Sequence, residues 1–180
     1  RAYGGSTVAY TGASIEIPEL VLGHWNVPGL TRADLAPRMA KFKQQNNVHE
    51  LADEDINENN FLFKAGCERL GLAVRKFPVN IKGCRGSGMC NMGCPNQAKQ
   101  GTNRVQLPQA AARGVEIVTN CRVERIGERS VVATVGRSPH GEPSPWPEGR
   151  YELSAKIVVV AAGAMHSAAL LQHSRLPVSL

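Results

Sequence analysis

The feature that most constrains this chain is a continuous apolar run that ends at a glycine. Residues 157–162 read Ile-Val-Val-Val-Ala-Ala, and they are followed by Gly163 and a helical pattern through Leu170 and Leu171. A run of this length, rich in β-branched residues, is typical of a strand buried on both faces of a parallel sheet. We therefore expect an α/β fold in which this strand leads through a glycine turn into a helix, whose free N–H groups can face a ligand.

The rest of the sequence predicts a mixture of helices and β-hairpins. Three segments carry helical signals: residues 31–47, 59–70 and 109–113. Thr31 is a candidate N-cap of the first, and Gly71 and Gly114 are expected to end the second and the third. Helix 59–70 is expected to pack an apolar face, including Phe63 and Leu70, into the core. Three β-rich runs and a hairpin tip rich in proline and glycine come later: residues 115–118, 122–126, 130–135 and 138–149. Residues 1–30 hold glycines without a sustained period, which indicates an extended loop that covers a ligand.

Composition limits the partners of such a chain. A length of 180 residues with 42% hydrophobic content suits one core with an appended lobe. The net charge of +6 comes from scattered Lys and Arg with only 5% aromatics, so no nucleic-acid partner is expected. The apolar runs are far shorter than the ~20 residues that cross a bilayer, so no transmembrane segment is expected. The chain begins at Arg1 without a Met or a leader, which leaves targeting unreadable. Its five cysteines favour a cytoplasmic or periplasmic bacterial-type soluble protein over a secreted, disulfide-rich one.

A second glycine turn lies near the start of the chain. Gly4-Gly5-Ser6-Thr7 combines permissive backbone with two hydroxyls, and such a turn can lie against a phosphate or a flavin edge. A dinucleotide-binding domain opens with a strand and a G-x-G-x-x-G turn, and the sequence holds no such motif. The first βαβ unit of such a domain is therefore expected to be absent.

The two turns together resemble the paired signatures of the glucose-methanol-choline (GMC) oxidoreductases. The first signature matches at Gly4 to Thr7 with Pro18 beyond it, and the second at Gly163-Ala164 with Ser167, Leu170-Leu171 and Ser174. The segments between them follow the order of that family's middle region: Trp25, Leu70-Gly71, Gly93-Cys94-Pro95, Ala98-Lys99, Leu107-Pro108-Gln109-Ala110 and Arg122 to Ile126. The resemblance covers the whole chain, as an internal fragment that runs from one signature to the other. It departs at three positions: Tyr10 stands where the family often has Asn, Ala168 where Pro or Ser is usual, and Arg175 where Gly is usual.

The resemblance implies a mixed α+β fold that forms part of an FAD-binding, Rossmann-like domain with helical and β-meander insertions. It divides the chain into an FAD-covering loop region, a helical segment, a Cys- and Gly-rich loop, and an FAD-binding portion with the meander and the final strand and helix: residues 1–30, 31–82, 83–101 and 102–180. It also implies a set of cofactor-binding residues: Gly4, Gly5, Ser6, Thr7, Val123, Ala162 and Gly163.

The activity that the resemblance implies is hydride transfer from a CH–OH donor of the alcohol, sugar or sterol class to FAD. The electron acceptor stays open. The family's catalytic histidine lies near the C-terminus and beyond Leu180, so we name no catalytic residue and expect the fragment alone to be inactive. Two other functions stay open: an iron–sulfur electron-transfer module and a non-catalytic nucleotide-binding domain.

The Cys- and Gly-rich loop at residues 83–101, which we call the thiol loop, allows two interpretations. Its three cysteines, Cys84, Cys90 and Cys94, follow the bacterial ferredoxin run with Ser87 in place of a second cysteine. They also resemble the loop that holds a three-iron cluster in sugar dehydrogenases of the same family. In the other interpretation the thiols pack without metal. We favour packed thiols and assign no metal site, and zinc lacks a suitably spaced His or fourth Cys.

Overall fold

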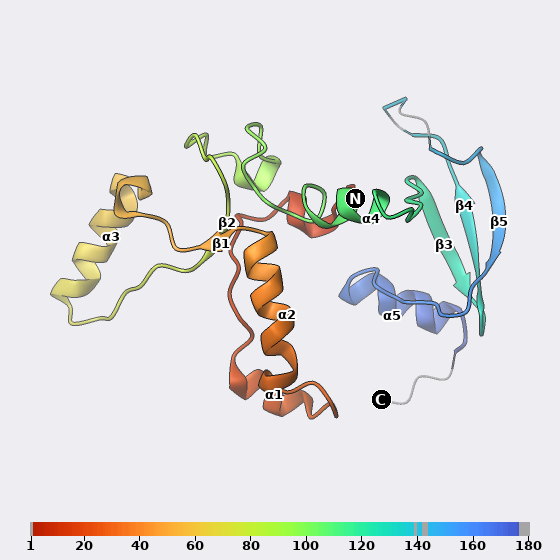
Figure 1. Cartoon of the computed structure of the whole chain (residues 1–180), viewed down its shortest axis with the longest axis horizontal. Coiled ribbons are helices and arrows are strands. Elements are labelled where there is room, and N and C mark those ends of the chain that lie inside the picture. Colours follow the sequence, from red (N-terminus) through yellow and green to blue (C-terminus); the bar gives the residue numbers. More distant parts are fainter. Residues whose placement is uncertain (1, 139, 142–143, 177–180) are drawn as a thin grey trace. The chain divides into compact units, whose positions relative to one another are not determined.

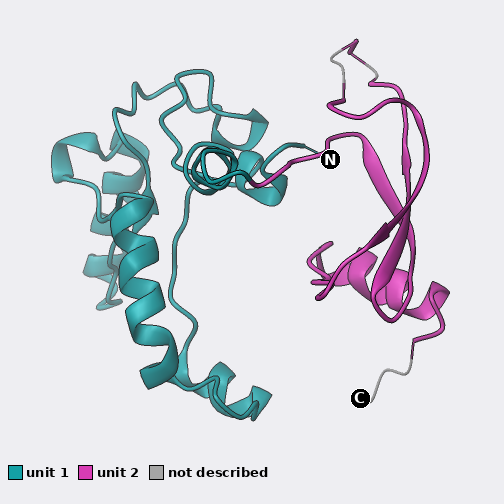
Figure 2. Ribbon diagram, turned by 45° about the vertical axis from the view of Figure 1, so that its right-hand side comes forward, with its two compact units in different colours: residues 1–114 teal, residues 115–180 magenta. Residues whose placement is uncertain are grey.

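The computed structural model describes residues 2–138, 140–141 and 144–176. They form two compact units, Arg1–Gly114 and Val115–Leu180, drawn in teal and magenta in Figure 2. The described residues form α-helices and two small antiparallel sheets, which confirms the predicted mixed fold class (Figure 1). No helix in this part of the chain combines the length and the apolar character needed to cross a membrane. The four-part division by motif stays a prediction.

The first unit is mostly helical. In chain order its elements are the 3-10 turn η1 (Gly5–Val8), α1 (Glu19–Trp25), α2 (Arg32–Gln45), β1 (Val48–His49), the 3-10 turn η2 (Asp53–Asp55), α3 (Glu58–Arg69), β2 (Val79–Asn80), the 3-10 turn η3 (Cys90–Met92) and α4 (Gln106–Ala111). Strands β1 and β2 pair in antiparallel fashion and bring the segment after α2 beside the segment that enters the thiol loop. An isolated bridge between Ile81 and Lys99 joins the two ends of that loop.

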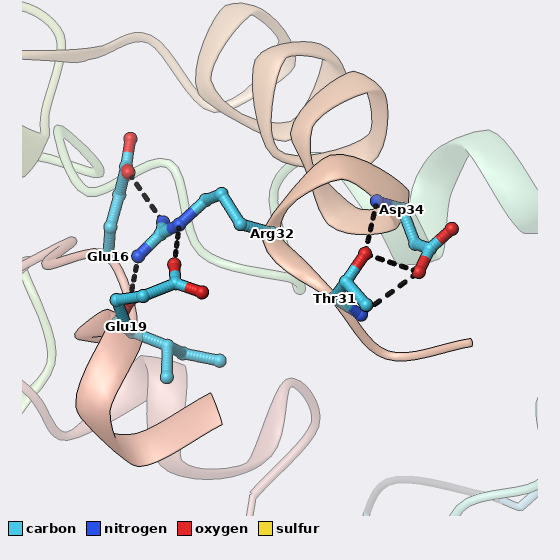
Figure 3. Close-up of polar contacts among 6 residues, drawn as sticks. Glu16, Glu19, Thr31, Arg32 and Asp34 are labelled. Atoms are coloured by element: carbon cyan, nitrogen blue, oxygen red, sulfur yellow. Dashed lines mark hydrogen bonds and ion pairs between the residues drawn. The ribbon is translucent and has the colours of Figure 1, made fainter. Parts of the chain in front are cut away.

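The start of α2 shows why this segment becomes a helix at the predicted place. The Thr31 side chain accepts a hydrogen bond from the Asp34 N–H, and the Asp34 carboxylate accepts one from the Thr31 N–H at 3.0 Å (Figure 3). This capping box satisfies donors that a helix start otherwise leaves free. At the next position the Arg32 guanidinium donates to Glu16 at 3.0 Å and to Glu19 at 3.2 Å. Because Glu19 is the first residue of α1, these ion pairs join the starts of the two helices.

Buried polar side chains lie at the centre of the first unit. Asn46, which follows α2, and Asn80 in β2 are each 1% exposed. Their side chains donate to the Gln100 carbonyl at 2.6 and 2.8 Å respectively, and the Gln106 amide donates to the Asn46 side-chain oxygen at 2.6 Å. These bonds join α2, β2, α4 and the segment that leaves the thiol loop. Among the described residues of this unit, the buried hydrophobic side chains are few: Leu22, Val79, Ala98 and Val105.

The second unit is a three-stranded antiparallel meander with one helix. Its elements are β3 (Cys121–Ile126), β4 (Ser130–Val135), β5 (Gly149–Ser154) and α5 (Ala164–His173), with strand order β3-β4-β5. The central strand β4 supplies most of the buried apolar residues: Val132, Ala133 and Val135. Helix α5 contacts β3. The Ser174 hydroxyl at the end of this helix accepts the Ile126 N–H at 2.8 Å and donates to the Leu170 carbonyl at 2.6 Å.

Most predicted helices and hairpin strands lie close to their expected places. Helices α2 and α3 correspond to residues 31–47 and 59–70, and Gly71 has the positive φ of 71° expected after a helix end. Strands β3 and β4 confirm the runs 122–126 and 130–135. Helix α4 begins three residues before the predicted 109–113, because the Val105 carbonyl already accepts the Gln109 N–H at 3.4 Å. Residues 139 and 142–143 of the expected hairpin tip lie outside the described residues.

The predicted strand at residues 157–162 is not formed. These residues belong to no ladder, and Ile157 and Val159 are each 81% exposed. A parallel strand requires a neighbour to pair with, and the described residues form only antiparallel ladders that do not include this run. The strand predicted at 115–118 is wrong for the same reason, and Val115 is 53% exposed.

Two further expectations are corrected. The predicted loop region 1–30 contains helix α1, which begins where the Pro18 carbonyl accepts the N–H groups of Val21 and Leu22 at 3.0 and 3.2 Å. Helix α3 buries none of its described residues, and Phe63 and Leu70 are 65% and 77% exposed. Packing within this unit therefore does not account for the apolar face of α3.

Candidate functional site

The Gly4-Gly5-Ser6-Thr7 segment folds into a turn with internal hydrogen bonds. Gly4 and Gly5 have φ angles of 100° and 59°, a conformation that favours glycine. The Thr7 hydroxyl donates to the Gly4 carbonyl at 2.7 Å, and the Thr102 hydroxyl donates to the same carbonyl at 2.8 Å. The Thr102 N–H donates to the Thr7 hydroxyl oxygen at 3.1 Å. The turn is thus held by its own last residue and by a residue far along the chain.

One side of this turn is closed and the other is open. A Cβ at Gly4 would lie 2.7 Å from the Cβ of Asn103, and a Cβ at Gly101 would lie 2.9 Å from the Thr7 hydroxyl, so both positions require glycine. A Cβ at Gly5 would meet nothing within 4 Å, and Gly5 and Ser6 are exposed. On this open side, backbone and a hydroxyl can approach a ligand such as a phosphate.

Lys99 is a buried cation bound to the segment that follows the turn. It is 5% exposed, and its ammonium donates to the carbonyls of Val8 and Tyr10 at 2.6 Å and of Cys90 at 2.5 Å. The ammonium also lies 5.2 Å from the centre of the Tyr10 ring, which is a cation–π geometry. A protonated lysine has three donors, and here each has a carbonyl partner. Lys99 therefore joins the end of η1 to the thiol loop.

The cysteines of the thiol loop have separate neighbours. The exposed Cys84 accepts the Gly86 N–H at 3.4 Å, and the Cys94 sulfur accepts the Ala98 N–H at 3.3 Å. Partial burial alone raises the pKa of the Cys94 thiol, but backbone N–H groups of residues 96, 98 and 99 and the Lys99 charge hold this pKa below its ordinary value of 9.0. Within the described ranges, no three His, Cys, Asp or Glu side chains lie so that they could hold a metal ion. This geometry gives the iron–sulfur interpretation no support.

The second glycine turn lies at the start of α5. Gly163 has φ 83° and ψ 162°, a conformation essentially restricted to glycine, and a Cβ there would meet nothing within 4 Å. The Ser167 hydroxyl accepts the Ala162 N–H at 3.0 Å, and the Ser167 N–H donates to the Gly163 carbonyl at 2.9 Å. No capping side chain and no acidic residue is found in the first turn of this described helix. Such a helix start suits a phosphate, because its first N–H groups have no intrahelical acceptor.

The seven predicted cofactor-binding residues divide between the two units. The structure brings Gly4, Gly5, Ser6 and Thr7 together in the first turn, and Ala162 and Gly163 in the second, while Val123 lies on β3 and is 38% exposed. Each turn, taken by itself, presents glycine backbone with open space where a Cβ would stand, at Gly5 in the first turn and at Gly163 in the second. The Thr7 hydroxyl differs from the rest, since it is already engaged inside its own turn.

The sequence alone does not single out the residues that support the first turn. Gly101, Thr102 and Lys99 contact it across a separation of more than ninety residues, such as the 91 between Lys99 and Val8. A lysine beside an alanine carries no local sign that it will be buried. The available signal is position, because Lys99 belongs to the Ala98-Lys99 step of the family resemblance and Gly101 and Thr102 follow it.

Comparison with known proteins supplies independent information about the family. Residues 1–179 match the GMC oxidoreductases. An uncharacterized GMC-type oxidoreductase of Mycobacterium tuberculosis is 36% identical over 98% of this chain, and the match covers 28% of that protein. A long-chain-alcohol oxidase of Arabidopsis thaliana is 32% identical over 68% of this chain, and the match covers 17% of that protein. No solved structure matches the chain.

The match to the family runs through both structural units and includes both glycine turns. The chain spans less than a third of the Mycobacterium relative, 28% of its length. The mixed fold of helices and small sheets agrees with part of such an oxidoreductase. The predicted resemblance is confirmed, and the chain belongs to the GMC oxidoreductase family.

Proposed function

We propose that the protein containing this chain is an FAD-dependent oxidoreductase that acts on the CH–OH group of an alcohol. The observation that carries the proposal is the pair of glycine turns, with open space at the Cβ position of Gly5 and of Gly163, within a family match over residues 1–179. FAD supplies the redox chemistry when bound, because its ring accepts the hydride that leaves the CH–OH carbon. A base must then take the hydroxyl proton. We assign no catalytic residue within this chain.

The residues of this chain hold and orient the dinucleotide. Gly5 and Ser6 present backbone and a hydroxyl on the open side of the first turn, and Thr7 keeps that turn in shape from inside. The uncapped start of α5, which follows the Ala162-Gly163 turn, would offer its free N–H groups to a phosphate of the dinucleotide. Val123 offers a partly exposed apolar side chain for the adenine, as the family resemblance implies.

An alcohol is the donor class that the relatives favour over sugars and sterols. Several relatives from Arabidopsis thaliana are named long-chain-alcohol oxidases, with identities of 27% to 33%. We therefore propose a long-chain primary alcohol as the first donor to examine. The acceptor that reoxidises the flavin is not assigned.

The visible absorption spectrum of the full-length protein tests the proposal. We expect flavin bands near ~370 and ~450 nm, and bleaching of the second band when a long-chain primary alcohol is added without oxygen. Glucose and cholesterol serve as donors of the other two classes. A broad brown absorbance without flavin bands would instead favour the iron–sulfur module, and a colourless protein would favour the non-catalytic nucleotide-binding domain. A flavin that none of the three donors bleaches would contradict the CH–OH assignment.

A further inference from the structure

Lys99 is placed in a way that needs an explanation. It is 5% exposed, and its ammonium is bound by the backbone carbonyls of Val8, Tyr10 and Cys90 rather than by a carboxylate. Burying a cation is costly unless every donor is satisfied. An apolar side chain of similar length would fill the same space without that cost, so the three bonds themselves account for the lysine.

The three bonds connect the first glycine turn to the thiol loop. Val8 is the last residue of η1, and Tyr10 lies two residues beyond it, so two of the bonds fix the exit of the turn. The third bond reaches Cys90, the first residue of η3 in the thiol loop. The backbone of Lys99 is itself fixed by its bridge to Ile81.

The segment that begins at Lys99 also holds the entry of the turn. The Thr102 hydroxyl donates to the Gly4 carbonyl at 2.8 Å, and Gly101 leaves no room for a Cβ beside Thr7. Both ends of the turn are therefore bound by residues 99–102, while Gly5 and Ser6 between those ends stay exposed.

We propose that Lys99 is a positioning residue for the flavin dinucleotide. It acts through the backbone of Val8 and Tyr10, which sets the orientation of the open side of the turn, and it does not touch the dinucleotide itself. Arginine replaces it poorly, because a planar guanidinium spreads its donors in a fork whereas three convergent carbonyls match the compact ammonium. The inference rests on the proposed FAD-dependent function.

The experiment compares three variants of the full-length protein after removal and readdition of FAD. We expect Lys99→Met to raise the dissociation constant for FAD about tenfold and to change the visible circular dichroism of the bound flavin, because three carbonyls lose their donor. Lys99→Arg should change the same dichroism with a smaller loss of affinity. Lys82→Met is the matched control, since Lys82 is exposed at the edge of the same loop and should leave both quantities unchanged.

A dissociation constant within about twofold of the parent and an unchanged dichroism in Lys99→Met would overturn the inference. So would a lower melting temperature of the FAD-free protein without any change in those two quantities, because that pattern describes a structural role alone. If Lys99→Met does not fold, Lys99→Arg decides by the same two measurements. Failure of the proposed function is distinguishable, because the unsubstituted protein would then bind no FAD.

Discussion

Two adjacent hydroxyls in the first glycine turn have different surroundings. Thr7 donates to the Gly4 carbonyl and accepts the Thr102 N–H, so its side chain belongs to the interior of the turn. Ser6 is exposed on the open side. A sequence motif treats the two residues alike, whereas in the structure Thr7 holds the turn and Ser6 is exposed.

This difference predicts that a substitution at Thr7 lowers stability, whereas a substitution at Ser6 weakens FAD binding. Thr7→Val should destabilise the FAD-free protein by about 1–2 kcal/mol, because two part-buried groups lose a hydrogen-bond partner, and Thr7→Ser should restore most of that loss. Ser6→Ala should change stability by less than about 0.5 kcal/mol and weaken FAD binding instead. Denaturant unfolding of the FAD-free protein and FAD titration measure the two quantities. A reversal, with Ser6→Ala the more destabilising, would contradict the assignment.

Gly163 is constrained by its backbone rather than by its neighbours. A Cβ would meet nothing within 4 Å, but φ is 83° and ψ is 162°. Gly163→Val should therefore cost about 1–3 kcal/mol in strain and lower the FAD content of the purified protein, because the turn must change shape. Gly136→Val is the control, since Gly136 has equal space without a positive φ. Full flavin occupancy in a stably folded Gly163→Val protein would remove this turn from the site.

At the scale of elements, charged side chains join α1 to α2. Arg32 at the start of α2 donates to Glu16, to Glu19 and to the Ile17 carbonyl, and Lys43 on the same helix also binds Glu16 (Figure 3 shows the contacts of Arg32). The hydrogen bond from Lys43 holds the pKa of Glu16 below its ordinary value of 4.5, against a smaller opposing effect of desolvation. Ionised Glu16 is therefore favoured by folding.

The contribution of this cluster should depend on pH. Because the Glu16 pKa is lower in the folded state, the stabilisation is complete above the ordinary value of 4.5 and is lost as the pH falls through the folded value. Lys43→Met should lower the melting temperature by roughly 1–3 °C at pH 7, and the difference from the parent should shrink as the pH falls below the ordinary Glu16 pKa of 4.5. Lys41→Met, an exposed change on the same helix, serves as control. A difference that stays constant throughout acid titration of the folded protein would show that the Glu16 carboxylate is not involved.

The elements that the sequence predicts well are those whose determinants are local. Helix α2 begins at a capping box formed within four residues, and β3 and β4 are joined by a tight turn. The apolar run at 157–162 depends on a partner strand, and the described residues supply none. An apolar pattern does not specify whether a partner strand is present. For this reason a run that is typical of a buried strand is exposed here.

The candidate site likewise contains some residues that the sequence reveals and others that it does not. Its glycine turns are visible in the sequence because a positive φ favours glycine, as at Gly4 and Gly163. The residues that hold the first turn are not visible, because Lys99 and Thr102 act across 91 and 98 residues on backbone carbonyls. A backbone carbonyl is offered by every residue type, so no sequence pattern reports which one a buried lysine will meet.

At the scale of the whole molecule, each unit has a small set of buried apolar residues of its own. The first unit adds hydrogen bonds among Asn46, Asn80 and Gln100, and the second is centred on β4. Large apolar side chains remain exposed on α3 and at Ile157 and Val159. The chain covers 28% of the length of its Mycobacterium relative.

The iron content of the full-length protein distinguishes a metal cluster from packed thiols in the thiol loop. An iron–sulfur cluster needs several thiolates directed at one cavity, with roughly three iron atoms per chain for three cysteines. Cys84 and Cys94 instead accept hydrogen bonds from separate backbone N–H groups, at residues 86 and 98, and the carbonyl of Cys90 is bound by Lys99. We therefore expect protein purified without oxygen to hold well below one iron atom per chain, and Cys90→Ser to leave its iron and flavin contents unchanged. Incubation of the parent with iron and sulfide under the same conditions is the control for loss during purification. Iron near stoichiometry that Cys90→Ser removes would place the three thiols around a cluster and make this protein an electron-relaying member of its family.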